Sequence, residues 1–326
     1  MALHDAAYHI GVETTYDTAV TPTRSYEVKT LQPEIETQIL HRVGHRKGAQ
    51  AKRHAKTIVT GSKHSVTMDV IDKGMGLLLQ GLVGSTTGPT QVATTTAYTQ
   101  QHDWTTGGPA KSLTAQQAIQ YPTTGGGVWT LSGNKASGFK LSQSADGLLE
   151  LTVDFVGGSA TTATAEATAA YTAAAGVFSW ADTVVTINSV AFDDVRDFEF
   201  ALDAGLKTDR HRLRANPIRK ESAHAGYASP TGTIGIDWTA ATFYDLFIAG
   251  TEVPLNVKWS AAANAIEAGH TYEFELDIPA IVFTGEAPSQ DSDSTDLASQ
   301  SLPFEVVEPS TGALFNLKVK STDTVL

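Results

Sequence analysis

The chain of 326 residues contains no cysteine. This absence excludes disulfide bridges, thiolate-held metal ions and a cysteine nucleophile. No apolar run approaches the ~20 residues of a membrane-spanning helix, and residues 1–16 carry charges in place of the apolar core of a secretory signal. From these absences we expect a soluble protein that does not insert into membranes.

Patterns typical of helices are scarce as well. Hydrophobic residues make up 41% of the chain and charged residues 18%, and short stretches rich in Thr, Val and Gly recur, which is typical of β proteins. Apolar and polar residues alternate over 149–155 and 272–278, which indicates antiparallel strands with one buried and one solvated face. Only two short helices are expected, Asp72 to Leu82 and Ala240 to Ala249, each ending beside a glycine.

Two halves of the chain carry the same features in the same order. In the first half, a basic segment is followed by Thr60-Gly61, an alternating strand and the run Leu77 to Gly81. The second half repeats this order with its own basic segment, Thr231-Gly232, another alternating strand and Leu246 to Gly250, roughly 170 residues later. The order and the spacing agree even though few residues are identical, which indicates an internal duplication.

The repeat predicts a mainly β protein with two tandem β-sandwich or barrel domains, each with one short flanking helix. The first domain would span residues 1–157 and the second residues 177–326. Residues 158–176 form a Thr/Ala-rich stretch with too little bulk for a core, and we interpret it as a linker, either extended or a solvated helix. Length alone would also allow one large β domain.

Charge is distributed unevenly along the chain. The net charge of −12 argues against a general nucleic-acid-binding surface, which needs clustered Lys and Arg. Two segments, 41–56 and 209–224, are nevertheless strongly basic within an otherwise acidic chain. Their cationic residues are Arg42, Arg46, Lys47, Lys52, Arg53 and Lys56 in the first segment, and Arg210, Arg212, Arg214, Arg219 and Lys220 in the second.

Three interpretations of the basic segments remain open. They could contact DNA phosphates, but the first segment lacks aromatic residues on which bases would stack, and a cationic wall would hold DNA in place. They could be solvated loops without a partner. We favour long hairpins that dock onto the acidic body of another copy of the chain, because a hairpin of this length reaches roughly 25 Å.

No group of residues suggests catalytic, cofactor or metal chemistry. Acid pairs such as Asp193-Asp194 are best explained as solvated strand faces. The histidines in and near the first basic segment lack the spacing and the partners of a zinc site. No nucleophile elbow or phosphate-binding glycine loop occurs. We therefore expect a protein that is not an enzyme and uses no cofactor or metal.

Several segments, taken in order, resemble major tail tube proteins of long-tailed, siphovirus-type bacteriophages, notably those of actinobacterial hosts. They are Val12 to Arg24, Pro109 to Thr114, Ala204 to Arg210, the triplet Arg219-Lys220-Glu221, Tyr244-Asp245, and Ala249 to Glu252. The resemblance implies a β-sandwich with a flanking helix, and rings whose inner strands join into one barrel. It further implies a long loop that contacts the next ring, an acidic lumen that repels DNA, and no enzymatic activity.

The resemblance also implies partners and a location. A virion tail protein, assembled in the host cytoplasm, would bind copies of itself and the tail tip, tape measure and tail terminator proteins. Genomic DNA would pass through the tube into the host without specific binding. Rings of this family often contain six one-domain chains, so two domains per chain suggest homotrimeric, pseudo-hexameric rings, with homohexameric rings as the alternative.

Residues for the acidic lumen are sought among acids at outward-facing strand positions. The candidates are Glu150, Asp154, Glu273, Glu275 and Asp277, although the same pattern would also suit an outer surface. The basic segments are the candidates for contacts between rings.

Two other classes of protein remain as alternatives. A head or capsid-decorating β protein would form oligomers without stacking. A carbohydrate-binding or hydrolytic β-sandwich would need an exposed cluster of tryptophans, and this interpretation is disfavoured because the five tryptophans are scattered along the chain.

Overall fold

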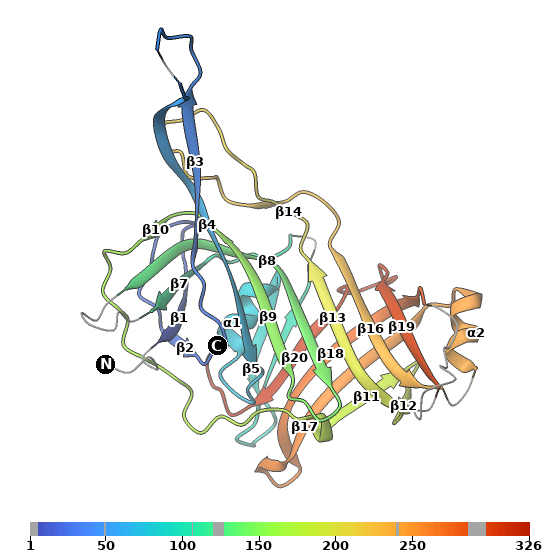
Figure 1. The fold of residues 1–326 in the computed structure, drawn as a ribbon. Coiled ribbons are helices and arrows are strands. Elements are labelled where there is room, and N and C mark those ends of the chain that lie inside the picture. The colour runs from blue at the N-terminus through green and yellow to red at the C-terminus, as the bar shows by residue number, and fades with distance from the viewer. Residues whose placement is uncertain (1–5, 49, 106, 120–126, 239–240, 286–297) are drawn as a thin grey trace.

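The computed structural model describes residues 6–48, 50–105, 107–119, 127–238, 241–285 and 298–326. Within these residues the chain consists mainly of antiparallel strands, with two short α-helices (Figure 1). The strands expected at 149–155 and 272–278 are confirmed, as are both helices. The mainly β fold class is therefore correct.

The first half consists of strands, with one helix between β4 and β5. Their bounds are β1 (Ala7–Val12), β2 (Arg24–Tyr26), β3 (Glu34–Arg42), β4 (Arg53–Asp69), α1 (Gly76–Leu82), β5 (Ser85–Gln91), β6 (Tyr98–Asp103), β7 (Leu113–Ala118), β8 (Val128–Ser144), β9 (Glu150–Gly157) and β10 (Ala160–Thr161).

The second half begins after a short 3-10 helix, Trp180–Asp182. Its elements are β11 (Thr183–Ile187), β12 (Val190–Phe192), β13 (Val195–Asp203), β14 (Leu206–Lys207), β15 (Ala223–His224), β16 (Ser229–Asp237), α2 (Thr242–Ala249), β17 (Val253–Glu267), β18 (His270–Phe283), β19 (Ser299–Val306) and β20 (Asn316–Ser321).

The strands of the two halves pair in the same order. In the first half the hydrogen-bonded neighbours run β2–β1–β7–β8–β9–β4–β3, and every pairing is antiparallel. In the second half they run β12–β11–β17–β18–β19–β16–β13, again antiparallel throughout. Each pairing in this order therefore has a counterpart in the other half.

The two halves are joined by a ladder between β8 and β13. Seven residue pairs connect these strands, from Asp197 opposite Ser144 to Asp203 opposite Gly138. The ladder produces one eight-stranded sheet in the order β3–β4–β9–β8–β13–β16–β19–β18. We call it the wall sheet.

The first half also contributes strands to the layer behind the wall sheet in the second half. The hairpin β5–β6 lies in the first half of the sequence, but β6 pairs with β20, which in turn pairs with β18. The first half thus contributes two strands to the second half's outer layer.

The core lies between the wall sheet and the outer strands, and it is continuous across the halves. The ring of Phe315 packs against Phe139 and Phe200, with ring centroids 6.0 and 5.2 Å apart. The indole nitrogen of Trp259 donates a 2.7 Å hydrogen bond to the side chain of Gln143, which links the second half to the first. Burial of these large side chains contributes to the cohesion between the halves.

Both helices end close to the expected residues but begin later. Helix α1 starts at Gly76 and not at Asp72, because the Asp72 carboxylate accepts hydrogen bonds from the Gly176 backbone, at 2.9 Å, and from the Asn264 side chain, at 2.9 Å. Helix α2 ends at Gly250, whose left-handed conformation (φ 58°) is the usual helix C-cap for glycine.

The Thr/Ala-rich segment 158–176 is an extended strap and forms no helix. The side chain of Gln116 accepts a hydrogen bond from the Ala167 backbone, at 2.9 Å, and donates one to the Ala165 carbonyl, at 3.2 Å. Further along, the Ser25 hydroxyl accepts from the Ala170 backbone, at 2.8 Å. The strap is therefore held against β1, β2 and β7 by specific polar contacts.

A buried carboxylate fixes the loop between β1 and β2. Glu13 is only 3% exposed. Its Oε1 accepts from the Thr114 hydroxyl and the Gly133 backbone, and its Oε2 accepts from the Ser112 hydroxyl and the Asp17 backbone, all at 2.7–3.1 Å. All four partners are donors, so a side chain that accepts through both of its oxygens fits this site.

We expect the substitution Glu13→Gln to destabilise the fold by about 1–3 kcal/mol. Whichever oxygen the amide NH₂ replaces, one backbone N–H is left facing another donor. Urea unfolding at neutral pH measures the effect, with Glu308→Gln on the exposed surface as the control. Equal stability of the two variants would contradict this role of Glu13.

Candidate functional site

The wall sheet has one apolar face and one polar face. On β9, Leu151 and Val153 point into the core, whereas Glu150, Thr152 and Asp154 point the other way. Residues directly opposite each other on neighbouring strands share a face, so the pairing register extends this polar face over the whole sheet.

The polar face is rich in acids. One row runs across four strands through Asp69, Glu150, Ser142 and Glu199. The acids on this face, read from the register, are Glu34, Glu36, Asp69, Glu150, Asp154, Asp197, Glu199, Asp203, Asp237 and Glu305, and Glu36 is paired with Arg219. Acids are therefore supplied by strands from both halves.

Four further cations compensate five of the other acids. Lys140 lies 2.6 Å from Glu199, and Arg196 lies 2.9 Å from Asp237. The other two pairings are of Lys63 with Glu34, and of Lys29 with both Asp69 and Glu150. These exposed or half-buried ion pairs add little stability, but they set the local charge.

Four acids of the polar face remain uncompensated. Among the described residues, no Lys, Arg or His lies within ion-pair distance of Asp154, Asp197, Asp203 or Glu305, and all four side chains are exposed. The polar face consequently carries an excess of negative charge.

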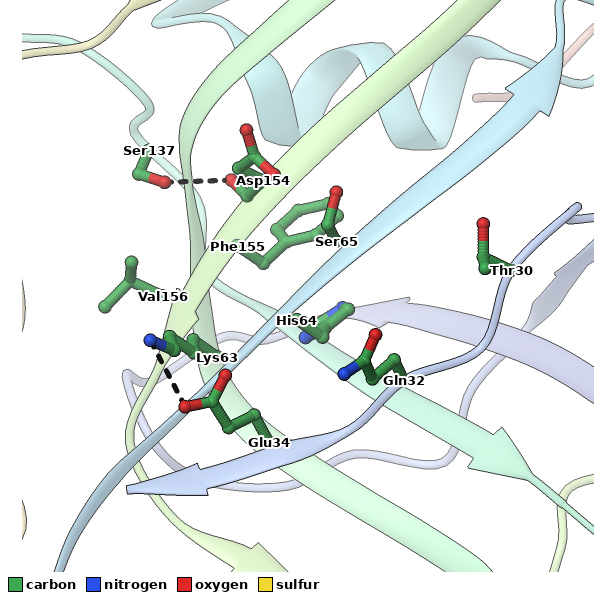
Figure 2. Close-up of a pocket in the computed structure, with 10 residues that line it drawn as sticks. All are labelled: Thr30, Gln32, Glu34, Lys63, His64, Ser65, Ser137, Asp154, Phe155 and Val156. Carbon is green, nitrogen blue, oxygen red and sulfur yellow. Dashed lines mark hydrogen bonds and ion pairs between the residues drawn. The ribbon is translucent and has the colours of Figure 1, made fainter. Parts of the chain in front are cut away.

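A recess of about 550 Å³ lies at the β3 end of this face (Figure 2). It is bordered by Thr30, Gln32 and Glu34 on one side and by parts of β4 and β9 on the other. Figure 2 shows the Lys63–Glu34 ion pair and the hydrogen bond from the Ser137 hydroxyl to the Asp154 carbonyl at its border. The recess is lined mainly by polar groups, and the acid and the base that meet at it, Glu34 and Lys63, form an exposed ion pair.

The one histidine at this recess is committed to the core. His64 is hydrogen-bonded to the Tyr8 hydroxyl at 3.1 Å and stacks on Phe155 at 4.9 Å between ring centroids. Burial lowers the pKa of His64 to about 3, so the ring is neutral at physiological pH. Within the described part of the chain, no group of three His, Asp or Glu side chains could hold a metal ion.

A long hairpin of β3 and β4 projects from the body at the same end of the molecule (Figure 1). We call its outer part, residues 37–60, the arm. All six cations that sequence analysis selected in the first basic segment are exposed on it. The arm also exposes apolar side chains, with Ile39 54% and Val43 77% accessible. These apolar residues were not predicted to be exposed, although Ile39 and Val43 stand among charged and polar residues in the sequence.

The second basic segment is not a hairpin. It is an irregular excursion whose ends are joined by the two-residue ladder of β14 and β15. Arg212, Arg214 and Lys220 are exposed and Arg210 is half-buried. The guanidinium of Arg214 bonds to carbonyls of its own loop and so shapes the excursion.

Arg219 differs from the other cations of the basic segments because it is only 4% exposed. It forms an ion pair with Glu36 on β3, its backbone N–H donates to the Thr60 carbonyl at 2.9 Å, and its side chain donates to the Thr208 carbonyl at 3.1 Å. Gly61 permits this contact, since a Cβ there would lie 2.3 Å from the Arg219 side chain. Arg219 therefore holds the second excursion against the base of the arm.

Comparison with protein families identifies the chain. A family model described as phage tail tube protein matches residues 4–306. The chain belongs to the phage tail tube protein family. Members of this family are structural proteins of the virion tail and not enzymes. A search among curated proteins gave no match. None of the helices in the described residues has the length and hydropathy needed to cross a membrane.

In this tail tube protein, the acids selected from the sequence lie on two different surfaces. Glu150 and Asp154 lie on the polar face of the wall sheet. Glu273, Glu275 and Asp277 lie on the part of β18 that is flanked by β17 and β20 in the outer layer. The acids of β13 were not among the residues predicted for the lumen, although Asp197, Glu199 and Asp203 alternate with apolar residues in the sequence.

The acids of β18 are neutralised by lysines from both neighbouring strands. Glu273 lies 2.9 Å from Lys258 and is also paired with Lys320, and Lys318 bridges Glu275 and Asp277 at 3.2 and 3.0 Å. Partial burial alone would raise the pKa of Glu273, but the ammonium groups of Lys320 and Lys258 outweigh it, and the pKa lies below its ordinary value. This surface is an ion-pair ladder that binds strands together.

Replacing Glu273 by Gln should lower the free energy of unfolding by up to about 1 kcal/mol at pH 7. The folded-state pKa lies below the unfolded value of about 4.3, so the carboxylate stabilises the fold fully above that value and less as the pH falls through the folded pKa. Urea unfolding at pH 7 and pH 3 should show a larger difference from wild type at pH 7 than at pH 3. The control is Glu252→Gln, at an exposed site, and an equal loss at both pH values would contradict the ion-pair role.

Proposed function

We propose that this protein polymerises as stacked rings into the tail tube, with the polar face of the wall sheet lining a channel for DNA. The observation that carries the proposal is the wall sheet itself. Eight strands from both halves form one continuous surface, apolar on the core side and acidic on the other, and an open sheet of this kind is completed by closure with further copies.

The proposed ring contains three chains. Support comes from the equal pairing order of the two halves, which favours an internal duplication and a pseudo-sixfold ring. Three wall sheets would supply twenty-four strands, and barrels of roughly 16–18 strands already enclose an aqueous channel. A ring of six chains is the alternative.

The acidic polar face suits a channel through which DNA moves without binding. Phosphates are repelled by uncompensated carboxylates such as Asp154 and Asp197, so the wall offers DNA no site at which to stop. Glu150 and Asp154 remain our candidates for the lumen. In this arrangement Glu273, Glu275 and Asp277 belong to the outer layer, where their charge is already neutralised.

The arm and the second excursion are proposed to dock onto the adjacent ring. The arm combines exposed cations with exposed apolar side chains, and a projecting element of this composition buries apolar area while its charges meet an acidic partner. Arg219 is left out of this contact because it is buried within its own chain. The further partners that we propose are the tail tip, tape measure and tail terminator proteins. We also propose that the phage is of the siphovirus type and that its tail assembles in the host cytoplasm.

Electron microscopy of the purified chain tests the proposal directly. In negative stain we expect filaments with an axial channel. A head or decoration protein would form compact oligomers without stacking, and such particles in the absence of filaments would overturn the assignment of the stacked tube.

The charge reversal Arg42→Glu, Arg46→Glu and Arg53→Glu should abolish tubes while leaving the monomer folded, because it places acids of the arm against an acidic neighbour. Sedimentation and microscopy measure assembly, and circular dichroism measures folding. Lys111→Glu, an exposed site outside both basic segments, is the control and should assemble normally. Tubes of normal length from the triple variant would refute docking by these cations.

A further inference from the structure

The two halves differ at the connection between equivalent strands. Strands β3 and β4 hold the places of β13 and β16 in the pairing order. The arm connects the first two strands, whereas the second excursion connects the other two and does not project as a ribbon. Figure 1 shows the second excursion running beside the base of the arm. The counterpart of the arm is thus placed against the arm.

The arm leaves the wall sheet at a β-bulge. Pairing of β4 with β9 stops short of the arm, so the arm is a ribbon of two strands. The register shifts between Glu36 and Thr37, and Thr60 on the other strand is left without a partner in the ladder. A bulge interrupts the ladder and bends the strand that carries it. The base of the arm is therefore a point at which the ribbon can pivot.

Beyond the bulge the arm is in contact with little but itself. Of its described residues, all are exposed except Ile58 and Thr60, which are half-buried. No other strand in the described part of the chain pairs with residues 37–60. A ribbon of two strands is at best marginally stable alone. The wall sheet by itself therefore does not fix the direction of the arm.

Arg219 of the second excursion contacts the bulge from outside. Its backbone N–H donates to the carbonyl of Thr60, the bulged residue, at 2.9 Å. Its guanidinium pairs with Glu36 and occupies the space beside Gly61 that a Cβ would need. The Thr60 hydroxyl donates to the Glu36 carbonyl at 3.2 Å and so links the two strands at the same point. One residue of the second half thus contacts both strands of the bulge.

The neighbours of Arg219 are tied to the body of the molecule. Glu221 forms an ion pair at 2.6 Å with Lys135 of β8, whose side chain is only 10% exposed. Ser222 is buried, and Arg219 also donates to the Thr208 carbonyl across the second excursion. A buried guanidinium that loses its carboxylate is left as an uncompensated charge, so the contact with the arm is costly to break. This part of the second excursion is therefore anchored on the wall sheet.

We propose that the second excursion braces the arm, and that Arg219 locks the bulge and thereby fixes the direction in which the arm leaves the wall sheet. Arg219 is then a positioning residue, which acts through the arm and touches no neighbouring ring. An arm that is already held in its docking direction loses less conformational freedom when it binds. The consequence for assembly rests on the proposed docking of the arm, whereas the brace is a property of the single chain.

The direction of the arm can be measured on single chains, because the chain contains no cysteine that would compete for labels. Two fluorophores are attached to the double variant Val43→Cys, Glu252→Cys, at exposed sites on the arm and on the body. Energy transfer is recorded from single molecules, at concentrations too low for rings to form. We expect one narrow distribution of distances with Arg219 present and a broad distribution in Arg219→Ala.

Three further variants separate the brace from a general loss of structure. Arg212→Ala removes an exposed cation of the same excursion and should keep the narrow distribution. Arg219→Lys should restore it in part, since an ammonium group still pairs with Glu36. Gly61→Ala should broaden it with Arg219 in place, and it supplies the result if circular dichroism shows that Arg219→Ala is unfolded. A narrow distribution in Gly61→Ala and in folded Arg219→Ala, or a broad one in Arg212→Ala, would overturn the brace.

The unlabelled chain tests the consequence for assembly. Sedimentation measures the protein concentration at which tubes appear, and Arg219→Ala should raise it about tenfold, with Arg219→Lys in between. The control Lys111→Ala, at an exposed site outside both basic segments, should leave it unchanged. An unchanged concentration in Arg219→Ala would overturn the role of arm direction in docking. If the natural chain forms no tubes, the proposed function fails, while the single-molecule distances still decide whether Arg219 braces the arm.

Discussion

The ladder between β8 and β13 is the contact on which the rest of the structure depends. It turns two four-stranded sheets into one wall sheet, and it aligns the two polar faces so that acids from both halves share a surface. It also brings Phe139 and Leu202 together over a common core. Without it, each half would leave an open strand edge, which is a liability for a soluble β protein.

Two acidic surfaces of this tail tube protein differ in how their charge is balanced. On β18, each acid has a lysine on an adjacent strand, so the charges hold strands together and little net charge remains. On the wall sheet, four acids have no such partner among the described residues, and the excess charge is left to act at a distance. The same residue types therefore bind strands together on one layer and leave a net negative charge on the other.

Local patterns in the sequence predict where the helices and strands lie better than they predict which residues pack around them. Alternation predicts β9 and β18, and glycine predicts the ends of both helices, because these signals depend on neighbouring residues. The start of α1 was predicted too early because Asp72 is engaged by Gly176 and Asn264, which are distant in sequence. Burial of Arg219 and neutralisation of Glu273 escaped prediction for the same reason, since their partners come from other strands.

The central claim is that each chain contributes two equivalent units to one ring. The rotational symmetry of assembled tubes, determined from end-on averages in electron cryomicroscopy, tests it most directly. The account predicts threefold symmetry, with six similar wall units per ring contributed by three chains. A ring of six chains with true sixfold symmetry would contradict it.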